Sequence, residues 1–431
     1  MIKSLLINKE TLKLFFICSA VIGVSISYAD FYLFHFALFL LAFFWFYEFR
    51  EEGYKLNIKI FSETNVLIPF IIFFWYILSL LWAPDIILGL KYIFYIFCGL
   101  ILVVNIIYYS ISTEAVNKLF KFLSYLIVLN IIIGLFESFT FFRMPISSYS
   151  PLSIYFGKEP INYSPFDNII NYSMFNPPTG FHWNTNDMAI CVLIALPFFL
   201  CSSKFYIKIF GLSAITTIII MAASRAVFLG LVLTFILYLI FIKKRIGTLL
   251  TFWLVSFALI WSMSLLRTSN NPRINEIANS ANAIKLYLGG EIDIGGSIEW
   301  RRQLVKNGLN AFKKTYGLGL GSGGTVANQE QIGPVAGRFT SMHNFWVELL
   351  VEGGIFIAFL FLLWFANIGL TLLKISKKNN NPDIKYYSQS LFLSVSAFVP
   401  SAIAASSTIY FFPMWIMFGF AIAIIRLDIK N

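Results

Sequence analysis

Long apolar runs recur along the whole chain and constrain its fold more than any other feature. Residues 71–81, 94–107 and 227–242 are examples. A helix needs about 20 mostly apolar residues to cross the hydrocarbon core of a bilayer. Only 12% of the 431 residues are charged, which is too few to cover the surface of a soluble globule of this size. The sequence therefore predicts an all-α integral membrane protein.

Apolar runs long enough for a helix to cross a bilayer predict about twelve transmembrane spans. They cover 11–28, 31–47, 65–82, 88–108, 119–139, 185–202, 205–222, 225–242, 248–265, 346–373, 386–405 and 408–426. The first is interpreted as a retained span, because a second span follows almost at once and Asp30 does not fit the small-residue cleavage site of a signal peptide.

The basic residues predict the orientation of these spans. With the N-terminus in the cytoplasm, the inner segments hold 19 of the 32 lysines and arginines. Of the others, only Lys91 and Arg225 lie outside two long loops. Lys and Arg gather on cytoplasmic loops, whereas long loops cross the membrane largely regardless of charge. Both termini are therefore expected in the cytoplasm. The net charge of +11 has a topological cause, and nucleic-acid binding is not expected.

This orientation divides the chain into five regions, with both long loops on the outer face. An N-terminal bundle (1–139) precedes a first loop (140–184) rich in Tyr, Ser, Pro and Asn; central helices (185–265) precede a larger loop (266–345) with an amphipathic helix, and C-terminal helices (346–431) follow. Connections this long are usually functional or disordered. Any chemistry is therefore expected on the outer face.

No metal or cofactor chemistry is visible in the sequence. The four cysteines lie inside apolar runs, so they are interpreted as small hydrophobic residues. No outer cluster has metal-ligand spacing, and no GxSxG motif is present. No cofactor is expected.

No internal repeat is visible in the sequence, which disfavours a transporter built from inverted repeats.

The second loop contains a predicted amphipathic helix over 296–314. At 100° per residue, Arg301 lies within roughly 20° of the centre of its apolar stripe, and Arg302 lies on its flank. An Arg that faces packed surface needs an anionic partner. That partner is either a ligand or an acid of the chain such as Glu299; a side chain that reaches water is the third alternative. The glycine-rich segment 316–324 that follows fits a flexible loop better than a phosphate cradle.

Two further segments carry ionisable groups at the outer face. His343, Asn344 and Glu348 lie at the start of the tenth span, and His is the side chain best suited to proton transfer near neutral pH. A capping or packing histidine is the alternative. Arg225 opens the eighth span, at a depth where an ionisable residue is a functional candidate unless it reaches the headgroups. Lys91 is placed similarly.

Together these residues resemble the O-antigen ligase and O-antigen polymerase superfamily of bacterial envelope glycosyltransferases, from about residue 178 to 360. The matching segments are Gly180–Ala189, Ser224–Arg225, Arg301 with Tyr316–Gly321, His343–Asn344 and Glu352–Gly354. Three positions depart from the family pattern: Thr185 replaces a usual Pro, Val305 an often-found Trp, and Arg302 beside Arg301 leaves open which arginine matches.

The resemblance implies a GT-C-like fold in the bacterial cytoplasmic (inner) membrane and a metal-independent transfer of a glycan from undecaprenyl diphosphate on the periplasmic face. Arg225, Arg301 and His343 would be catalytic. Other residues would bind substrate, namely Arg338, Arg302, Lys91, Asn184, Asn186, Asn344 and Glu348. Expected partners are the undecaprenyl-diphosphate-linked oligosaccharide, membrane lipids, and a chain-length regulator and flippase of the same pathway.

The motifs leave the acceptor open. A polysaccharide polymerase, for O-antigen or capsule repeat units, is favoured because the Tyr- and Asn-rich first loop offers groups that stack on sugars and bond to them. The alternatives are an O-antigen ligase that uses lipid A-core, and a protein acceptor. A flippase or other transporter belongs to a different class, and it would place ionisable groups near the membrane midplane.

Overall fold

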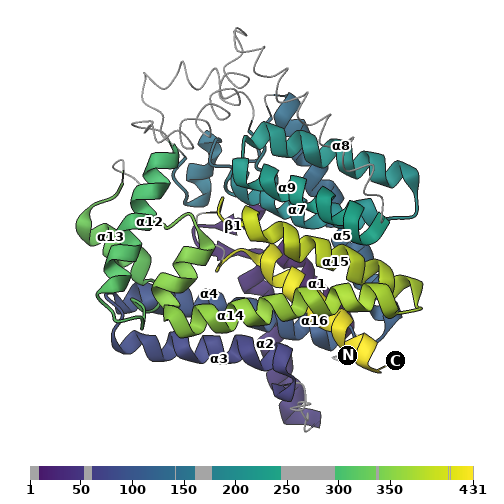
Figure 1. Ribbon diagram of the computed structural model, residues 1–431, viewed down its shortest axis with the longest axis horizontal. Coiled ribbons are helices and arrows are strands. Elements are labelled where there is room, and N and C mark those ends of the chain that lie inside the picture. Colours follow the sequence, from purple (N-terminus) through teal and green to yellow (C-terminus); the bar gives the residue numbers. More distant parts are fainter. Residues whose placement is uncertain are drawn as a thin grey trace.

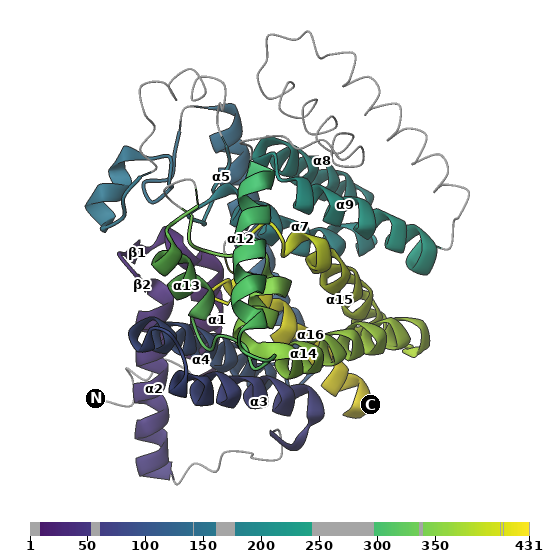
Figure 2. The same ribbon diagram turned by 60° about the vertical axis from the view of Figure 1, so that its left-hand side comes forward.

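The computed structural model describes residues 9–52, 61–140, 142–160, 177–243, 297–335, 339–405, 407 and 409–430. Most helices run side by side through these residues, and α12 and α13 lie across one end of them (Figures 1 and 2). The α-helices are α1 (Lys9–Ile22), α2 (Leu33–Glu52), α3 (Thr64–Leu78), α4 (Ile86–Tyr109), α5 (Thr113–Phe139), α7 (Thr185–Cys201), α8 (Phe205–Ala222), α9 (Arg225–Leu237), α12 (Ser297–Lys313), α13 (Gly324–Ile332), α14 (Phe345–Lys378), α15 (Pro382–Ser401) and α16 (Phe412–Lys430). Short 3-10 or π turns are η2 (Gly23–Ser25), η4 (Ser79–Leu81), η5 (Pro151–Phe156) and η6 (Tyr238–Lys243).

The helices overlap the predicted spans wherever the structure describes them, but their bounds differ. Residues 23–25 and 27–28 of the first predicted span form a 3-10 turn and a strand, and residues 31–32 of the second form a strand. The ninth predicted span, 248–265, lies outside the described residues. In the described part, 7 helices are long and apolar enough to cross a membrane. They are Thr64–Leu81, Ile86–Tyr109, Thr113–Phe139, Phe205–Ala222, Arg225–Lys243, Phe345–Lys378 and Phe412–Ile429. The chain is thus a multi-pass membrane protein, while the full count of twelve spans and their orientation stay predictions.

Polar contacts gather at the two ends of the helix bundle. At one end, the Arg426 Nε atom lies 2.7 Å from Glu63 Oε2, and the Asn117 amide donates to Asp383 Oδ2 at 2.9 Å. At the other, the backbone N–H of Phe345 donates to Ala402 O at 3.2 Å. The first end corresponds to the predicted cytoplasmic side. The second carries α12, α13 and the starts of α4, α7, α9 and α14, and it is called the outer end below.

A small β-hairpin at the outer end was not predicted by the sequence analysis. Strands β1 (Ser27–Tyr28) and β2 (Phe31–Tyr32) pair antiparallel, and a two-residue turn joins them. Two-residue hairpins need a positive φ in the turn, and Ala29 supplies it with φ +50°. The Ala29 N–H donates to Phe156 O at 2.7 Å, which attaches the hairpin to η5 of the first loop.

The glycine-rich segment is a packed joint, so the expected flexible loop was wrong. Helix α14 is broken at Gly354, whose φ of +82° is not helical. The N–H of Ile355 donates to Gly317 O at 2.9 Å, and that of Leu320 donates to Val351 O at 2.7 Å. A Cβ atom at Gly354 would lie 2.3 Å from Leu318 O. The glycines are therefore needed because two backbone segments approach closely here.

Candidate active site at the outer end of the bundle

A tight turn between α8 and α9 brings Arg225 to the outer end. Ala223 ends α8 in the left-handed conformation with φ +53°, Ser224 is the N-cap of α9, and Arg225 is its first residue. The two helices therefore reverse direction within two residues. Arg225 is exposed among the described residues.

Helix α12 forms where the amphipathic pattern predicted it, and it distinguishes the two adjacent arginines. Leu304 is buried on its inner face, Arg301 is partly buried, and Arg302 is exposed. Arg302 Nη1 lies 3.7 Å from Glu299 Oε2, one turn earlier on the same helix. Such an exposed pair contributes little to stability. Arg301 is therefore the arginine that faces the protein, and Arg302 faces away from the site.

Arg301 and Arg225 lie close enough to influence each other's charge. Burial lowers the pKa of the Arg301 guanidinium, and the positive charge of Arg225 lowers it further. Two like charges held together in a partly buried place are unfavourable unless an anion is shared between them. No carboxylate acts on the pKa of Arg301 among the described residues. The pair is thus arranged like a binding site for an anion.

His343 lies within electrostatic range of the same arginine. Burial lowers the pKa of its imidazole to about 4, the charge of Arg301 contributes in the same direction, and a hydrogen bond with the Ala404 backbone opposes both. Its ring meets Phe339 edge-on at 5.8 Å between centroids. The backbone of His343 has φ +50°, a conformation that residues other than glycine rarely adopt. The imidazole is therefore neutral at pH 7 and can accept a proton.

The structure thus brings together Arg225, Arg301 and His343, which come from three separate segments of the chain. Two guanidinium groups can hold a diphosphate by charge-assisted hydrogen bonds. A neutral imidazole beside them can remove a proton from a hydroxyl group. This combination can stabilise a departing diphosphate while it activates a nucleophile.

The other predicted substrate-binding residues have varied positions. Asn184 and Asn344 are N-caps, and their side chains accept from the N–H groups of Asp187 at 2.9 Å and Val347 at 3.3 Å. Lys91 is paired with Asp30 at 3.0 Å. Asn186 is partly buried. Arg338 lies outside the described residues.

Glu348 is completely buried inside the bundle and does not line the outer surface. It lies within electrostatic range of Tyr76 and Tyr92. Glu352, one turn further along α14, accepts from the N–H and hydroxyl of Thr325 at 3.2 and 2.5 Å. The two carboxyl groups therefore belong to a buried polar layer beneath the outer end.

Sequence analysis missed Glu137, which holds the segment containing the first family motif. This buried residue lies near the end of α5. Its carboxylate accepts from the N–H groups of Thr179 and Gly180, both at 2.7 Å, and from that of Met144 at 3.0 Å. Asn130, two turns earlier, accepts from Phe181 N–H at 2.8 Å. An acid inside an apolar run was the available signal, because such residues are rarely placed in a span without a role.

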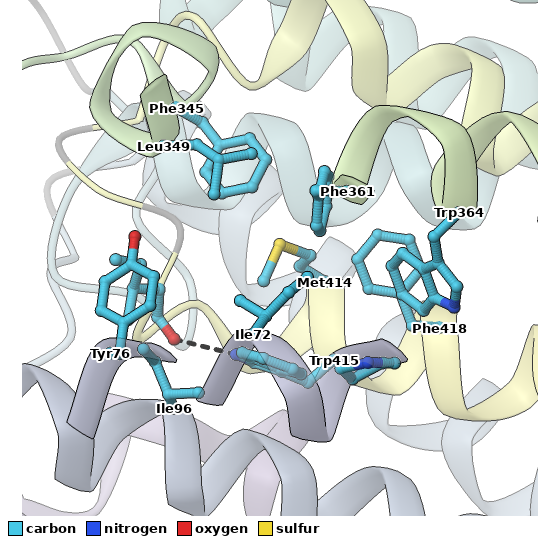
Figure 3. Close-up of a pocket in the computed structure, with 12 residues that line it drawn as sticks. Ile72, Tyr76, Ile96, Phe345, Leu349, Phe361, Trp364, Met414, Trp415 and Phe418 are labelled. Atoms are coloured by element: carbon cyan, nitrogen blue, oxygen red, sulfur yellow. Dashed lines mark hydrogen bonds between the residues drawn. The ribbon is translucent and has the colours of Figure 1, made fainter. Parts of the chain in front are cut away.

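Two cavities lie away from the three residues. One of about 50 Å³ has apolar walls formed by α3, α4, α14 and α16, and Tyr76, Phe345 and Met414 lie around it (Figure 3). The other, about 1200 Å³, lies between α5, α7, α8, α15 and α16 and reaches Lys204 at the opposite end of the bundle. In the described part of the chain, no group of three His, Cys, Asp or Glu side chains could hold a metal ion.

Comparison with known proteins agrees with the motifs. Residues 210–362 match the family Wzy_C, described as O-antigen ligase. The teichuronic acid biosynthesis protein TuaE of Bacillus subtilis (strain 168) is 24% identical over 364 residues, which cover 82% of this chain and 70% of that protein. The family match contains Arg225, Arg301 and His343. The resemblance to O-antigen ligases and polymerases is therefore confirmed, and it rests on the match of residues 210–362 to the Wzy_C family.

Proposed function

We propose that the protein is a polysaccharide polymerase that transfers a glycan from undecaprenyl diphosphate to a sugar hydroxyl of a second glycan, on the outer face of the cytoplasmic membrane. The observation that carries this proposal is the convergence of Arg225, Arg301 and His343 at one end of the bundle. The relative named for teichuronic acid biosynthesis supports polymer assembly in particular.

In the proposed reaction, neutral His343 takes the proton from the acceptor hydroxyl as the oxygen attacks the anomeric carbon of the donor sugar. The bond between that carbon and the diphosphate oxygen breaks, and the diphosphate leaves with the electron pair. Arg225 and Arg301 stabilise the charge that develops on the leaving group, which is where preorganised cations contribute most to the rate. The products are an elongated glycan and undecaprenyl diphosphate.

The test uses purified protein in lipid vesicles with the lipid-linked repeat unit that accumulates in a strain lacking the gene. Polymer on undecaprenyl diphosphate, resolved as a ladder on a gel, is the expected product. A ligase would instead need lipid A-core before any product forms, and a transporter would move the lipid-linked glycan across the vesicle without joining units. Failure to form any new glycosidic bond with either acceptor would overturn the proposal.

A ligase is the second candidate, because the matched family is described as O-antigen ligase. The deletion strain distinguishes the two activities in the cell. Loss of a ligase leaves finished polymer on undecaprenyl diphosphate, whereas loss of a polymerase leaves single repeat units there or on the final acceptor.

A further inference from the structure

Lys158 of the first loop is held between two aromatic rings at the outer end. Its ammonium nitrogen lies 5.3 Å from the centroid of Tyr32 and 5.3 Å from the centroid of Trp183. Cations are attracted to the faces of such rings, most strongly when they have lost water. Tyr32 belongs to the β-hairpin, and Lys158 is the second residue after the η5 turn. Trp183 belongs to the segment that Glu137 holds.

The backbone fixes this arrangement at several points. The Lys158 N–H donates to Ser153 O at 3.1 Å, and the Ala29 N–H of the hairpin donates to Phe156 O at 2.7 Å. The Ser148 N–H donates to Trp183 O at 3.1 Å. The cage around Lys158 is therefore formed by folded segments and not by one mobile side chain.

The charges around this cage do not balance. Burial lowers the pKa of Lys158, the neighbouring charge of Lys91 lowers it further, and only Asp30 acts in the opposite direction. Asp30 is already bonded to Lys91 at 3.0 Å. The ammonium groups of Lys158 and Lys91 therefore both draw on the carboxylate of Asp30. A partly desolvated cation without an ion-pair partner is costly, and an anionic ligand would remove this cost.

Solvent reaches this cluster from the outer face. The side chains of Lys91 and Asp30 are 47% and 69% exposed. The cluster is also connected to His343. The ring of His182, the residue before Trp183, packs on Phe411 at 5.9 Å between centroids. The N–H of Phe345, two residues after His343, donates to Ala402 O. The cluster and His343 thus lie at the same end of the bundle, joined by these buried contacts.

We propose that Lys158 and Lys91 form an acceptor subsite for an anionic sugar, in which a carboxylate or phosphate of the acceptor glycan pairs with the ammonium group held between Tyr32 and Trp183. This inference rests on the proposed glycan transfer. It assigns a substrate class, a negatively charged repeat unit, and it gives Lys158 a role in acceptor binding that is separate from bond formation.

The test separates acceptor from donor. The repeat unit is isolated from the deletion strain, released from its lipid and labelled with a fluorophore, so that it can act only as an acceptor. A second sample has its carboxyl groups reduced to alcohols, or its phosphate removed. Wild type, Lys158→Gln, Lys158→Arg and the matched control Lys314→Gln, an exposed lysine after α12, are compared in vesicles of neutral lipid.

We expect Lys158→Gln to raise the KM for the native acceptor about tenfold or more, while kcat changes less than about twofold. A tenfold change corresponds to about 1.4 kcal/mol. Neutralising the acceptor should raise the KM of the wild type similarly, and Lys158→Gln should then add nothing. Lys158→Arg should retain most of the affinity, and Lys314→Gln should match the wild type.

Binding of the labelled acceptor, measured by fluorescence anisotropy without donor, gives the same comparison independently of turnover. If the wild type joined no glycans, the proposed function would fail while this measurement still tested the subsite. An uncharged repeat unit, or equal binding by wild type and Lys158→Gln, would overturn the subsite. An effect of Lys158→Gln that appears only when anionic phospholipid is added would assign Lys158 to a lipid headgroup and would also overturn it.

Discussion

Arg301 of α12 and Arg225 at the start of α9 lie within electrostatic range of each other at the outer end of the bundle, and the charge of Arg225 lowers the pKa of Arg301. A long stretch of chain separates the two residues, so only the tertiary structure makes them neighbours. Two cations placed together in this way are destabilising until an anion binds between them. This cost indicates a site that is arranged for its ligand.

Replacement of either arginine by alanine should therefore lower the rate of glycan transfer. Removal of one group that stabilises a departing charge typically costs about 100-fold in rate, and we expect this loss for Arg225→Ala and for Arg301→Ala. Initial rates with the purified lipid-linked repeat unit measure it. The control is Arg302→Ala, which should remain within about twofold of the wild type because Arg302 is exposed and paired with Glu299. Equal losses in Arg301→Ala and Arg302→Ala would contradict the assignment.

The acid limb of the pH profile should lie below the ordinary pKa of histidine. Burial and Arg301 depress the pKa of His343 to about 4, so the imidazole of the free protein stays neutral, and able to accept a proton, from pH 7 down to about pH 5. Binding of an anionic diphosphate should raise this pKa. The profile of kcat/KM for the donor reports the free protein and provides the measurement.

Removal of the Arg301 charge should move the titration of His343 to higher pH. In Arg301→Met one of the two causes that depress its pKa is absent. The chain has 3 histidines, so NMR of protein labelled at histidine carbon can follow each ring, with His35→Gln and His182→Gln variants for assignment. Arg302→Gln serves as the control and should leave the titration in place. An unchanged His343 titration in Arg301→Met would show that the charge of Arg301 does not influence the pKa of His343.

Glu137→Ala should destabilise the outer end of the bundle. Its carboxylate accepts from three backbone N–H groups, those of Met144, Thr179 and Gly180, and each buried donor left without a partner costs about 1–3 kcal/mol. We expect a loss of at least ~3 kcal/mol, seen as a lower melting temperature in detergent. Glu114→Ala, at an exposed position on the same helix, should change it little. A melting temperature equal to that of the wild type would contradict the anchoring role.

Two glycine variants distinguish backbone strain from a steric clash at positions with positive φ. They are Gly354→Ala and Gly333→Ala. Both positions have such angles, +82° and +96°. A Cβ atom at Gly354 would lie 2.3 Å from Leu318 O, whereas nothing lies within 4 Å at Gly333. Gly333→Ala should cost only the strain of a backbone conformation that side chains rarely adopt, about 1–3 kcal/mol. Gly354→Ala should prevent correct folding, seen as aggregation on size-exclusion chromatography. Similar behaviour of the two variants would contradict the packed joint.

The sequence predicted the helices well because each span must satisfy its own backbone hydrogen bonds in lipid and must present a long apolar surface. It also predicted α12, because a stripe of apolar residues at helical spacing is a local property. The β-hairpin at 27–32 was not predicted, since two residues per strand give no periodicity. The glycine-rich segment was misjudged because its purpose, close contact with the break in α14, depends on residues distant in the sequence.

The sequence by itself determined a membrane protein with many spans, its resemblance to a family, and the residue types of the site. Only the tertiary structure decided that Arg301 and not Arg302 faces Arg225, that Glu348 is buried, and that Lys158 lies between Tyr32 and Trp183. The physical reason is that helix formation and membrane insertion depend on neighbours along the chain. The proximity of charged side chains depends instead on how separate helices pack, and pairwise packing leaves no periodic pattern in a single sequence.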